Sequence, residues 1–361
     1  MVKTSPFGSV NGKPVTLLPL SDNTGTQVEL LSLGAAIRSI VVPDRCGTPT
    51  DICLGYDSPG EYWEQDACFG GIIGRCANRI AGASFSLNGQ EWQLTANEGV
   101  NHLHGGTEGF HRRHWEFLWG DSFVTFIRSS LHLEEGYPGL LQVEVTYTLR
   151  DGCLGIYYQA HSDRDTVVNL TNHAYFNLAG HTGGPVDDHM LTVRASRYTP
   201  CREDNIPTGE LQDVAGTPLD LRCGVRLGDR LETPLLTATR GFDHNLVLDM
   251  PTGAPEASPA ATLWCPSSGI GMEVCTTLEG IQIYTAGFLT PRDGKGGVRY
   301  GPRHAVCLET QHFPDAVHHA GFPSPILRAG EEYRHFTKYR FFVKTESICE
   351  PGSFGSPCPA I

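Results

Sequence analysis

The sequence lacks any run of about 18 apolar residues, the length that a membrane-spanning helix needs. It also lacks an excess of basic residues, because 27 Lys and Arg stand against 40 Asp and Glu and give a net charge of −13. A surplus of negative charge repels nucleic-acid backbones and anionic membrane surfaces. We therefore expect neither a nucleic acid nor a membrane as a partner.

Export and zinc-binding signals are also missing from the sequence. Residues 1–14 are polar and do not contain the apolar core of a signal peptide. The 12 cysteines are scattered without a C-x-x-C pair, so zinc-ribbon spacing is absent. Cysteines without an export signal are typical of reduced thiols, and we expect a cytoplasmic protein. Cys53, Cys76 and Cys307 stand among apolar neighbours, which predicts that they are buried.

Turn-forming residues are abundant: the chain contains 42 Gly and 24 Pro, and 40% of its residues are hydrophobic. This composition favours many short strands joined by turns over long helices. Alternation of apolar and polar residues predicts strands at 15–18, 27–31, 37–42, 123–131, 140–149, 154–160, 191–198, 261–264, 271–277, 280–285, 305–309 and 335–343.

Two short turn motifs predict hairpins, and one region predicts an excursion from the sheet. Asn88-Gly89 and Asp151-Gly152 each stand between alternating residues, as hairpin turns do. Residues 199–240 are rich in turn formers and have few periodic runs. No internal repeat or linker divides the sequence. We expect one domain over residues 1–345, followed by a flexible tail over 346–361 that contains Pro, Gly, Ser and Cys.

Residues 170–178 combine an extended pattern with polar side chains that are unusual in a strand. Alternate side chains of a strand share a face, so His173, Tyr175 and Asn177 would point one way. The residues between them are apolar and can be buried. An imidazole, a phenol and an amide on one face can together bind a polyhydroxy ligand through hydrogen bonds. The alternative is a core histidine that is hydrogen-bonded to its neighbours.

Three other stretches concentrate polar residues in the same way, at 71–80, 101–106 and 307–315. The first leads to Asn78 and Arg79, and the guanidinium of arginine offers a planar fork of donors that suits ring and hydroxyl oxygens. Taken alone, Arg79 is more typical of a surface salt bridge. His104 lies in the second stretch, where a loop of solvated histidines is the alternative.

A metal site is a further possibility for the histidine-rich segment 101–114. His102 and His104, followed by Glu108, fit half of a cupin-type metal motif. The second half of that motif, a Pro-x-Gly leading to another histidine, is not found in the sequence. We therefore expect no bound metal.

Together these stretches resemble the aldose 1-epimerases, also called galactose mutarotases, from about Val15 to about Val343. The connecting pieces at 135–139, 206–210, 241–245 and 328–333 carry the same resemblance in the same order. The resemblance implies an all-β fold: a large antiparallel β-sandwich of the galactose mutarotase-like supersandwich type, with a sugar-binding cleft.

The resemblance also implies the reaction, which is the interconversion of the α and β anomers of free hexoses such as galactose and glucose. Glu309 would be the general base and His173 the general acid of ring opening and reclosure. The implied substrate-binding residues are Asn78, Arg79, His104, Tyr175, Asp243 and Gln282. No hydride moves and no covalent intermediate is needed, so we expect no cofactor.

Three alternatives stay open from the sequence. A hexose-6-phosphate 1-epimerase of the same fold would need a cationic pocket, which Arg112-Arg113 in the 109–114 loop could supply. A non-catalytic sugar-binding module would have lost its acid or base, yet both positions are filled. A cupin-like metalloenzyme would need the missing second motif. The expected partner is a hexopyranose, and the expected assembly is a monomer or weak dimer.

Overall fold

The computed structural model describes residues 3–250 and 257–344. Within these residues the largest layer is an antiparallel sheet of nine strands, in the order β11-β12-β13-β14-β29-β23-β22-β17-β20. Its strands are β11 (Glu116–Trp119), β12 (Phe123–Ser130), β13 (Leu141–Arg150), β14 (Cys153–Ser162), β29 (Glu332–Val343), β23 (Ile270–Thr276), β22 (Ser258–Trp264), β17 (Met190–Val193) and β20 (Val225–Arg226).

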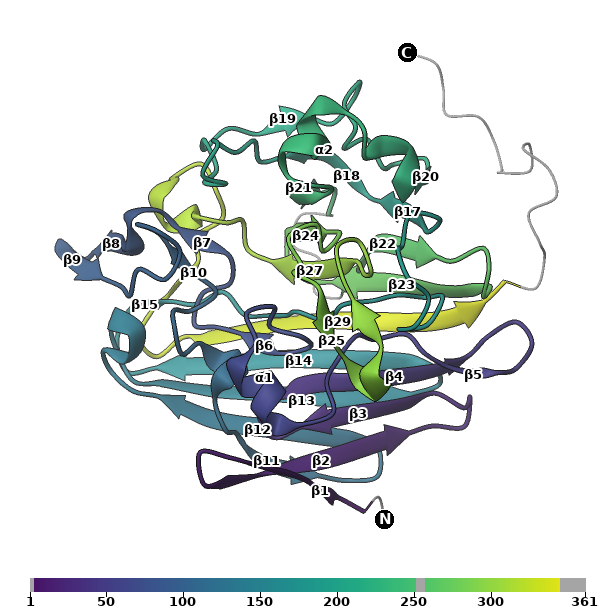
Figure 1. Cartoon of the computed structure of the whole chain (residues 1–361). Helices are drawn as coiled ribbons and strands as arrows, with labels where there is room; N and C mark the ends of the chain where they lie inside the picture. Colours follow the sequence, from purple (N-terminus) through teal and green to yellow (C-terminus); the bar gives the residue numbers. More distant parts are fainter. Residues whose placement is uncertain (1–2, 251–256, 345–361) are drawn as a thin grey trace.

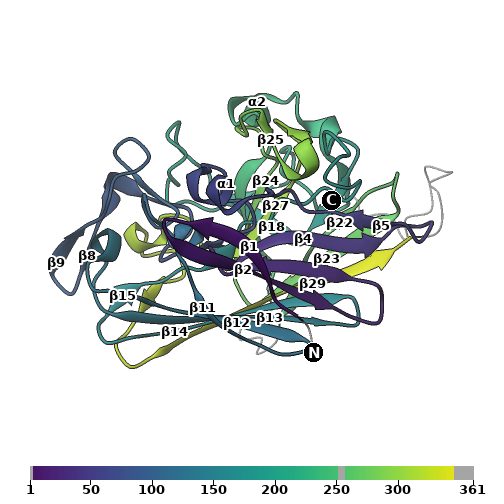
Figure 2. The ribbon, with the colours of Figure 1, turned by 60° about the horizontal axis from the view of Figure 1, so that its bottom comes forward.

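Two five-stranded antiparallel sheets in the described chain pack against this layer. The first contains β1 (Ser5–Val10), β2 (Lys13–Ser21), β3 (Gln27–Leu31), β4 (Ala36–Pro43) and β5 (Pro49–Asp51). The second, in the order β19-β18-β21-β24-β27, contains β19 (Gln212–Asp213), β18 (Ala195–Tyr198), β21 (Asp243–Leu248), β24 (Gly280–Tyr284) and β27 (Cys307–Gln311). Figure 2 shows the first sheet, in purple, as a layer over the teal strands β11–β14.

Short pairs and helical turns complete the described structure. The pairs are β6 (Ile72–Ile73) with β16 (Thr171–Asn172), β7 (Arg79–Ile80) with β10 (His102–Leu103), β8 (Ser84–Leu87) with β9 (Gln90–Gln93), β15 (Thr166–Val167) with β28 (Ile326–Leu327), and β25 (Arg292–Asp293) with β26 (Arg299–Tyr300). The helices are α1 (Pro59–Glu64) and α2 (Pro234–Ala238), with 3-10 turns at Ala81–Ala83, Phe110–Arg112, Glu134–Gly136, Leu227–Arg230, Lys295–Gly297 and Ala316–His318.

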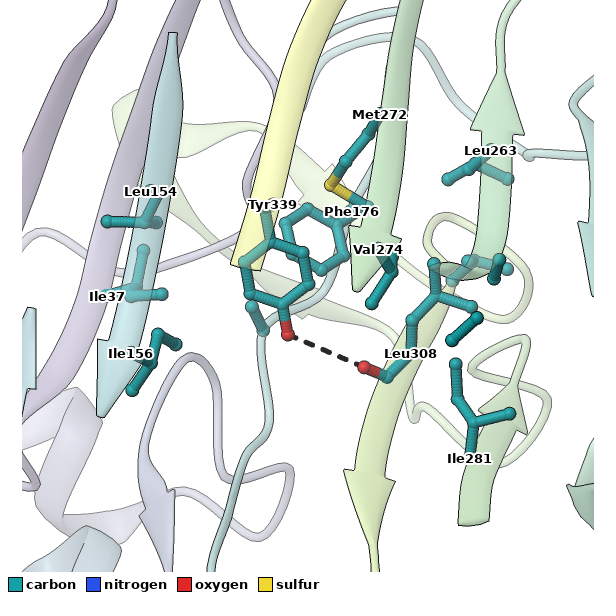
Figure 3. Close-up of a cluster of buried hydrophobic side chains, with 14 of the residues drawn as sticks. Ile37, Leu154, Ile156, Phe176, Leu263, Met272, Val274, Ile281, Leu308 and Tyr339 are labelled. Carbon is teal, nitrogen blue, oxygen red and sulfur yellow. Dashed lines mark hydrogen bonds between the residues drawn. The ribbon is translucent and has the colours of Figure 1, made fainter. Parts of the chain in front are cut away.

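The hydrophobic core lies between the layers and follows from residue alternation. In β13, Val143, Val145 and Tyr147 are fully buried, while the residues between them are exposed or half-buried. Figure 3 shows apolar side chains of β22, β23 and β29 meeting those of β24 and β27, with Leu263, Met272, Val274, Ile281 and Leu308 among them. The hydroxyl of Tyr339 donates to the backbone oxygen of Leu308 at 3.5 Å, which satisfies a polar atom inside this core.

The predicted all-β class is confirmed, and so are both hairpins. Asn88-Gly89 joins β8 to β9, and Asp151-Gly152 joins β13 to β14. The φ values of Asp151 and Gly152 are 50° and 70°, the left-handed conformation that tight hairpin turns require. The cysteines at 53, 76 and 307 are buried, as predicted. The predicted tail, residues 346–361, lies outside the described residues.

Two predicted strands differ from the structure. Residues 191–198 do not form one strand: β17 ends at Val193 and belongs to the nine-stranded sheet, while β18 begins at Ala195 and belongs to the second five-stranded sheet. In residues 170–178, regular pairing is limited to Thr171 and Asn172. The rest of that stretch is irregular, because its backbone groups form isolated hydrogen bonds with several different segments. The described helices include none long and apolar enough to span a membrane.

Candidate active site

A cavity of about 400 Å³ lies at the second five-stranded sheet and is called the site cavity here. All eight residues that the sequence singled out for catalysis or binding line it: Asn78, Arg79, His104, His173, Tyr175, Asp243, Gln282 and Glu309. They come from segments up to 231 residues apart, from Asn78 to Glu309. The fold therefore brings the predicted residues together.

Strand register places the carboxylates and the amide of the site. Gln282 of β24 stands directly opposite Glu309 of β27, and Asp243 of β21 stands opposite Tyr284 of β24. The neighbouring strand residues Ile281, Ile283 and Leu308 are buried in the core. Because alternate residues of a strand point to opposite faces, Gln282 and Glu309 face away from that core and into the cavity.

These side chains are only partly satisfied by one another. Gln282 donates from Nε2 to Oδ1 of Asp243 at 2.7 Å. Oε1 of Gln282 and Oε2 of Glu309 are buried and have no hydrogen-bond partner in the described structure. A buried acceptor without a donor is unfavourable, so both oxygens are suited to receive hydrogen bonds from a ligand's hydroxyl groups.

Arg79 enters the cavity from β7, and a carboxylate fixes its position. Its Nε and Nη2 donate to the two carboxylate oxygens of Glu98, each at 2.7 Å. This bidentate pairing holds the guanidinium plane in one orientation. Arg79 also opposes the rise in the pKa of Asp243 that burial causes, and the net pKa of Asp243 is still raised.

His104 is held with one ring nitrogen directed to the protein. Its Nδ1 accepts a hydrogen bond from the backbone N–H of Asn78 at 3.2 Å, which leaves Nε2 for a ligand. His104 has a φ of 52°, and the next residue, Gly105, packs so closely that a Cβ there would lie 1.8 Å from the backbone oxygen of Gly74. The Gly105 position therefore excludes a side chain, and this fixes the turn that carries the imidazole.

His173 is positioned by its backbone and by a neighbouring ring. Its N–H donates to the oxygen of Gly71, and its own carbonyl accepts from Gly70, both at 2.9 Å. Its imidazole stacks on Tyr175 with a centroid distance of 5.0 Å and an interplanar angle of 20°. Nε2 of His173 then lies 3.6 Å from Oε1 of Glu309.

Burial sets the protonation of this pair. Removal from water, reinforced by the charge of Asp243, raises the pKa of Glu309 well above its ordinary value. Burial lowers the pKa of His173 to about 4. The pKa of His104 is also lowered, by burial first and then by His173 and Arg79. A carboxyl group whose pKa is raised and an imidazole whose pKa is lowered therefore face one cavity, and pKa values perturbed in this way are typical of sites of acid–base chemistry.

The same residues form a set that could ligate a cation. His104, His173 and Glu309 offer three ligand atoms that all lie within 4.8 Å of one another. Two imidazoles and a carboxylate suit first-row divalent metals. The expectation that the protein binds no metal therefore stays a prediction, and it needs an experiment.

Two sequence interpretations are corrected by the structure. Asn177 does not share the cavity with His173, because its side-chain amide donates to the backbone oxygens of Gly184 and His304. Arg112 and Arg113 do not line the site cavity either, but border a separate one. The cationic pocket that a hexose-6-phosphate enzyme needs is therefore not supplied to this site by the 109–114 loop.

Sequence reasoning missed several residues at the cavity. Asp66 and Arg292 form an ion pair at 2.5 Å on its wall, and Asn205, Phe288 and Glu98 also line it. The acidic and aromatic character of segment 60–66 was a weak signal for Asp66. No local pattern pairs it with Arg292, which follows 226 positions later.

Comparison with known proteins identifies the family. The sequence profile described as aldose 1-epimerase matches residues 16–340. The chain belongs to the aldose 1-epimerase family. It is 43% identical over 318 residues to the galactose mutarotase of Homo sapiens, covering 88% of this chain and 91% of that protein. It is 35% identical to the aldose 1-epimerase of Escherichia coli K12 over 349 residues, covering 95% of this chain and 100% of that protein.

Solved structures of aldose 1-epimerase relatives share the fold. An aldose epimerase homologue from C. elegans superposes with a TM-score of 0.83 at 29% identity, covering 91% of this chain and 98% of its own. A galactose 1-epimerase from Lactobacillus acidophilus gives a TM-score of 0.82 at 25% identity, covering 95% and 99%. These likenesses confirm the predicted galactose mutarotase-like sandwich.

Proposed function

We propose that this family member is an aldose 1-epimerase that interconverts the α and β anomers of free hexopyranoses, with galactose and glucose as substrates. It is an enzyme of the isomerase class, as its relatives are named. The observation that carries the proposal is the buried Glu309–His173 pair, 3.6 Å apart and facing a cavity of sugar size.

The chemistry needs two proton transfers in each direction. Glu309 removes the proton of the anomeric hydroxyl, while His173 gives a proton to the ring oxygen, and the bond from C1 to the ring oxygen breaks. The open aldehyde rotates about its C1–C2 bond. Closure on the other carbonyl face returns the proton of the former ring oxygen to His173 and the proton of Glu309 to the anomeric oxygen, so neither protons nor electrons are consumed.

The remaining polar groups of the cavity suit the hydroxyl groups of a sugar. Asp243 and Gln282 supply hydrogen-bond acceptors beside Glu309. Arg79 supplies a guanidinium group, and His104 supplies a ring nitrogen. Asn78 holds His104 in place, and Tyr175 stacks behind His173. We assign Asp243, Gln282, Arg79 and His104 to substrate binding. Asn78 and Tyr175 position the two imidazoles and also contact the sugar where they line the cavity.

The charge balance of the site cavity favours a free sugar over a sugar phosphate. Of its lining arginines, Arg79 is paired with Glu98 and Arg292 with Asp66. Asp243 and Glu309 add two further acidic groups. A phosphate group entering this cavity would meet arginines that are already neutralised.

Polarimetry tests the proposal. Freshly dissolved α-galactose or α-glucose should reach its equilibrium rotation faster with the protein, in proportion to protein concentration. Galactose 6-phosphate and glucose 6-phosphate serve as matched substrates, and we expect the free sugars to have the higher kcat/KM. Acceleration of the phosphorylated sugars alone would instead assign the hexose-6-phosphate reaction.

All eight predicted site residues come from one chain, which supports activity as a monomer or a weak dimer. Size-exclusion chromatography combined with the rate assay at several protein concentrations tests this point. The rate per chain should not change with dilution.

A further inference from the structure

A second cavity, of about 350 Å³, is lined by a concentration of basic residues and is called the basic cavity here. Its lining residues are Lys13, Trp63, Arg112, Arg113, His114, Glu116, Ile127, Arg128 and Ser129. None of them lines the site cavity. Four permanent cations therefore face a single lining carboxylate, in a chain whose net charge is −13.

Four buried side-chain nitrogens around the basic cavity have no hydrogen-bond partner in the described structure. They are Nε of Arg112, Nε2 of His114, and Nε and Nη1 of Arg128. The side chain of Arg128 is only 8% exposed. The three guanidinium nitrogens are donors, whereas Nε2 of His114 is a donor only in the tautomer that carries its proton there. Buried donors without acceptors are unfavourable, and three of them around one cavity indicate a ligand that accepts hydrogen bonds.

The surroundings hold these cations in place without fully satisfying them. Arg128 packs over the ring of Phe110, with 4.4 Å between its Cζ and the ring centroid, and donates only from Nη2 to Glu134. Arg112 donates from Nη1 to Thr107 and from Nη2 to Gln65, which are both backbone oxygens. Guanidinium groups that are fixed while some donors stay unpaired are preorganised for an anion.

Three carboxylates limit the positive charge. Glu108 pairs with Arg113 at 2.8 Å, Glu134 pairs with Arg128 at 2.9 Å, and Glu116 lines the cavity. Lys13 and Arg112 have no carboxylate partner among the ion pairs of the described chain. An excess of cationic donors therefore remains at the basic cavity.

We propose that the basic cavity binds a small oxyanion of the phosphate class, either inorganic phosphate or the phosphate group of a phosphorylated sugar. Phosphate oxygens accept several hydrogen bonds at once and match the fork of a guanidinium. The cavity is large enough for a small phosphorylated molecule, and Trp63 offers an aromatic surface for its organic part. The proposal is independent of the reaction assigned to the site cavity.

Isothermal titration calorimetry tests the proposal, with inorganic phosphate titrated into the full chain at constant ionic strength. We expect saturable binding with a Kd of about 1 mM or lower. The double variant Lys13→Gln/Arg113→Gln should weaken this binding at least about tenfold. Arg340→Gln is the matched control, since Arg340 also pairs with a glutamate, Glu273, on a distant strand, and it should change the Kd less than about twofold.

Further titrations identify the source of the phosphate group and test whether phosphate binds at the site cavity instead. Tighter binding of glucose 6-phosphate than of phosphate assigns a phosphorylated sugar, and equal binding assigns the free anion. Binding should persist in saturating galactose and in Glu309→Gln protein. Absence of saturable binding of both phosphate compounds overturns the proposal, and so does displacement by galactose or an unchanged Kd in the double variant. A thermal melt of each variant verifies that it is folded.

Discussion

Two glutamate–histidine pairs of this molecule differ in geometry, in hydrogen bonding and in their position relative to the site cavity. Glu309 and His173 face the site cavity, with 3.6 Å between Oε1 and Nε2. Glu279 and His312 lie outside it, with 2.6 Å between Oε1 and Nδ1. His312 follows Glu309 by only three residues, so one short segment, 307–315, contributes to both pairs.

Hydrogen bonding separates the two pairs. Burial is the largest single influence on the pKa of Glu279 and acts to raise it, but the hydrogen bond and the charge of His312, with smaller contributions from the Glu279 backbone and from His335, together outweigh it, so the pKa of Glu279 is lowered. Glu309 has no such bond, and its pKa is raised by burial and by the charge of Asp243. The satisfied pair stabilises the fold, whereas the unsatisfied pair leaves its proton acceptor and its donor for a substrate.

The largest expected effect is on turnover at the unsatisfied pair. Glu309→Gln removes the proposed proton acceptor with little change in size, and His173→Asn removes the proposed proton donor and keeps a polar side chain. Each positioned proton transfer is worth about 10²–10⁴ in rate. We expect kcat to fall at least about 10²-fold in each variant, with a smaller change in KM, in the polarimetric assay.

Two controls sharpen this prediction. Glu279→Gln makes the same chemical change in the satisfied pair, and we expect kcat within about threefold of the unmodified protein. The double variant Glu309→Gln/His173→Asn should be less impaired than the product of the single effects, because both residues serve one ring-opening step. Near-normal turnover of Glu309→Gln at saturating sugar would place the base elsewhere, with His104 the first residue to test.

A smaller effect on the kinetic constants is expected from Asp243, which lies beside the Glu309–His173 pair but has no proposed role in proton transfer. Asp243→Asn keeps an oxygen for the bond from Gln282 but removes a charged acceptor. Loss of one charge-assisted hydrogen bond should raise KM roughly tenfold and lower kcat no more than that. Initial rates over a range of galactose concentrations measure both constants. A collapse of kcat at constant KM would assign Asp243 to the transition state instead.

The two glutamate variants should rank in the opposite order for stability: Glu279→Gln should destabilise the fold, and Glu309→Gln should not. The lowered pKa of Glu279 contributes stability that is present above its unfolded value of 4.5 and is lost as pH falls. Glu279→Gln should therefore lower Tm at pH 7 by roughly 5 °C. The raised pKa of Glu309 contributes stability that is lost as pH rises, so Glu309→Gln should keep or raise Tm, more at pH 9 than at pH 5. Differential scanning calorimetry of both variants checks the contrast.

The pH profile should show the pair acting as one unit. Between the pKa of His173, about 4, and the raised pKa of Glu309, the pair holds a single proton. Movement of that proton from Glu309 to His173 produces the reactive carboxylate and imidazolium without a change in their total charge. We expect kcat/KM to be nearly constant between these two pKa values and to fall on either side of them. An acid limb centred near 6.5, the ordinary value for histidine, would contradict this picture.

The sequence predicted local features and named a set of candidate site residues, because both depend on short motifs. Hairpin turns at Asn88 and Asp151 follow from turn chemistry alone. The family resemblance identified each candidate residue by its motif, and the structure places all of them at one cavity. The proximity of His173 and Glu309 itself needs the fold, since they come from different segments 136 positions apart.

Long-range packing explains what the sequence could not supply. Asn177 looked like a ligand residue beside His173, but two distant backbone oxygens take up its amide. Strand alternation continues from Leu191 through Ala195, although the chain changes sheets at Arg194. The two arginines of the 109–114 loop are adjacent to His111, yet they border the basic cavity. For Asn177 and for residues 191–198, partners far along the chain decide the outcome.

The smallest expected effect is that of metal removal, and it tests whether the unsatisfied pair is completed by sugar or by a cation. His104, His173 and Glu309 could hold a divalent metal, since their ligand atoms lie within 4.8 Å. A metal there would occupy the nitrogen and oxygen that the proposed proton transfers use. We expect dialysis against EDTA to leave kcat unchanged and added Zn²⁺ to inhibit in competition with galactose. Loss of activity on dialysis, restored by Zn²⁺ or Mn²⁺, would show that the three residues are metal ligands. The cation would then activate the sugar oxygens. The two glutamate–histidine pairs would differ because one coordinates a metal, and not because one lacks a hydrogen bond.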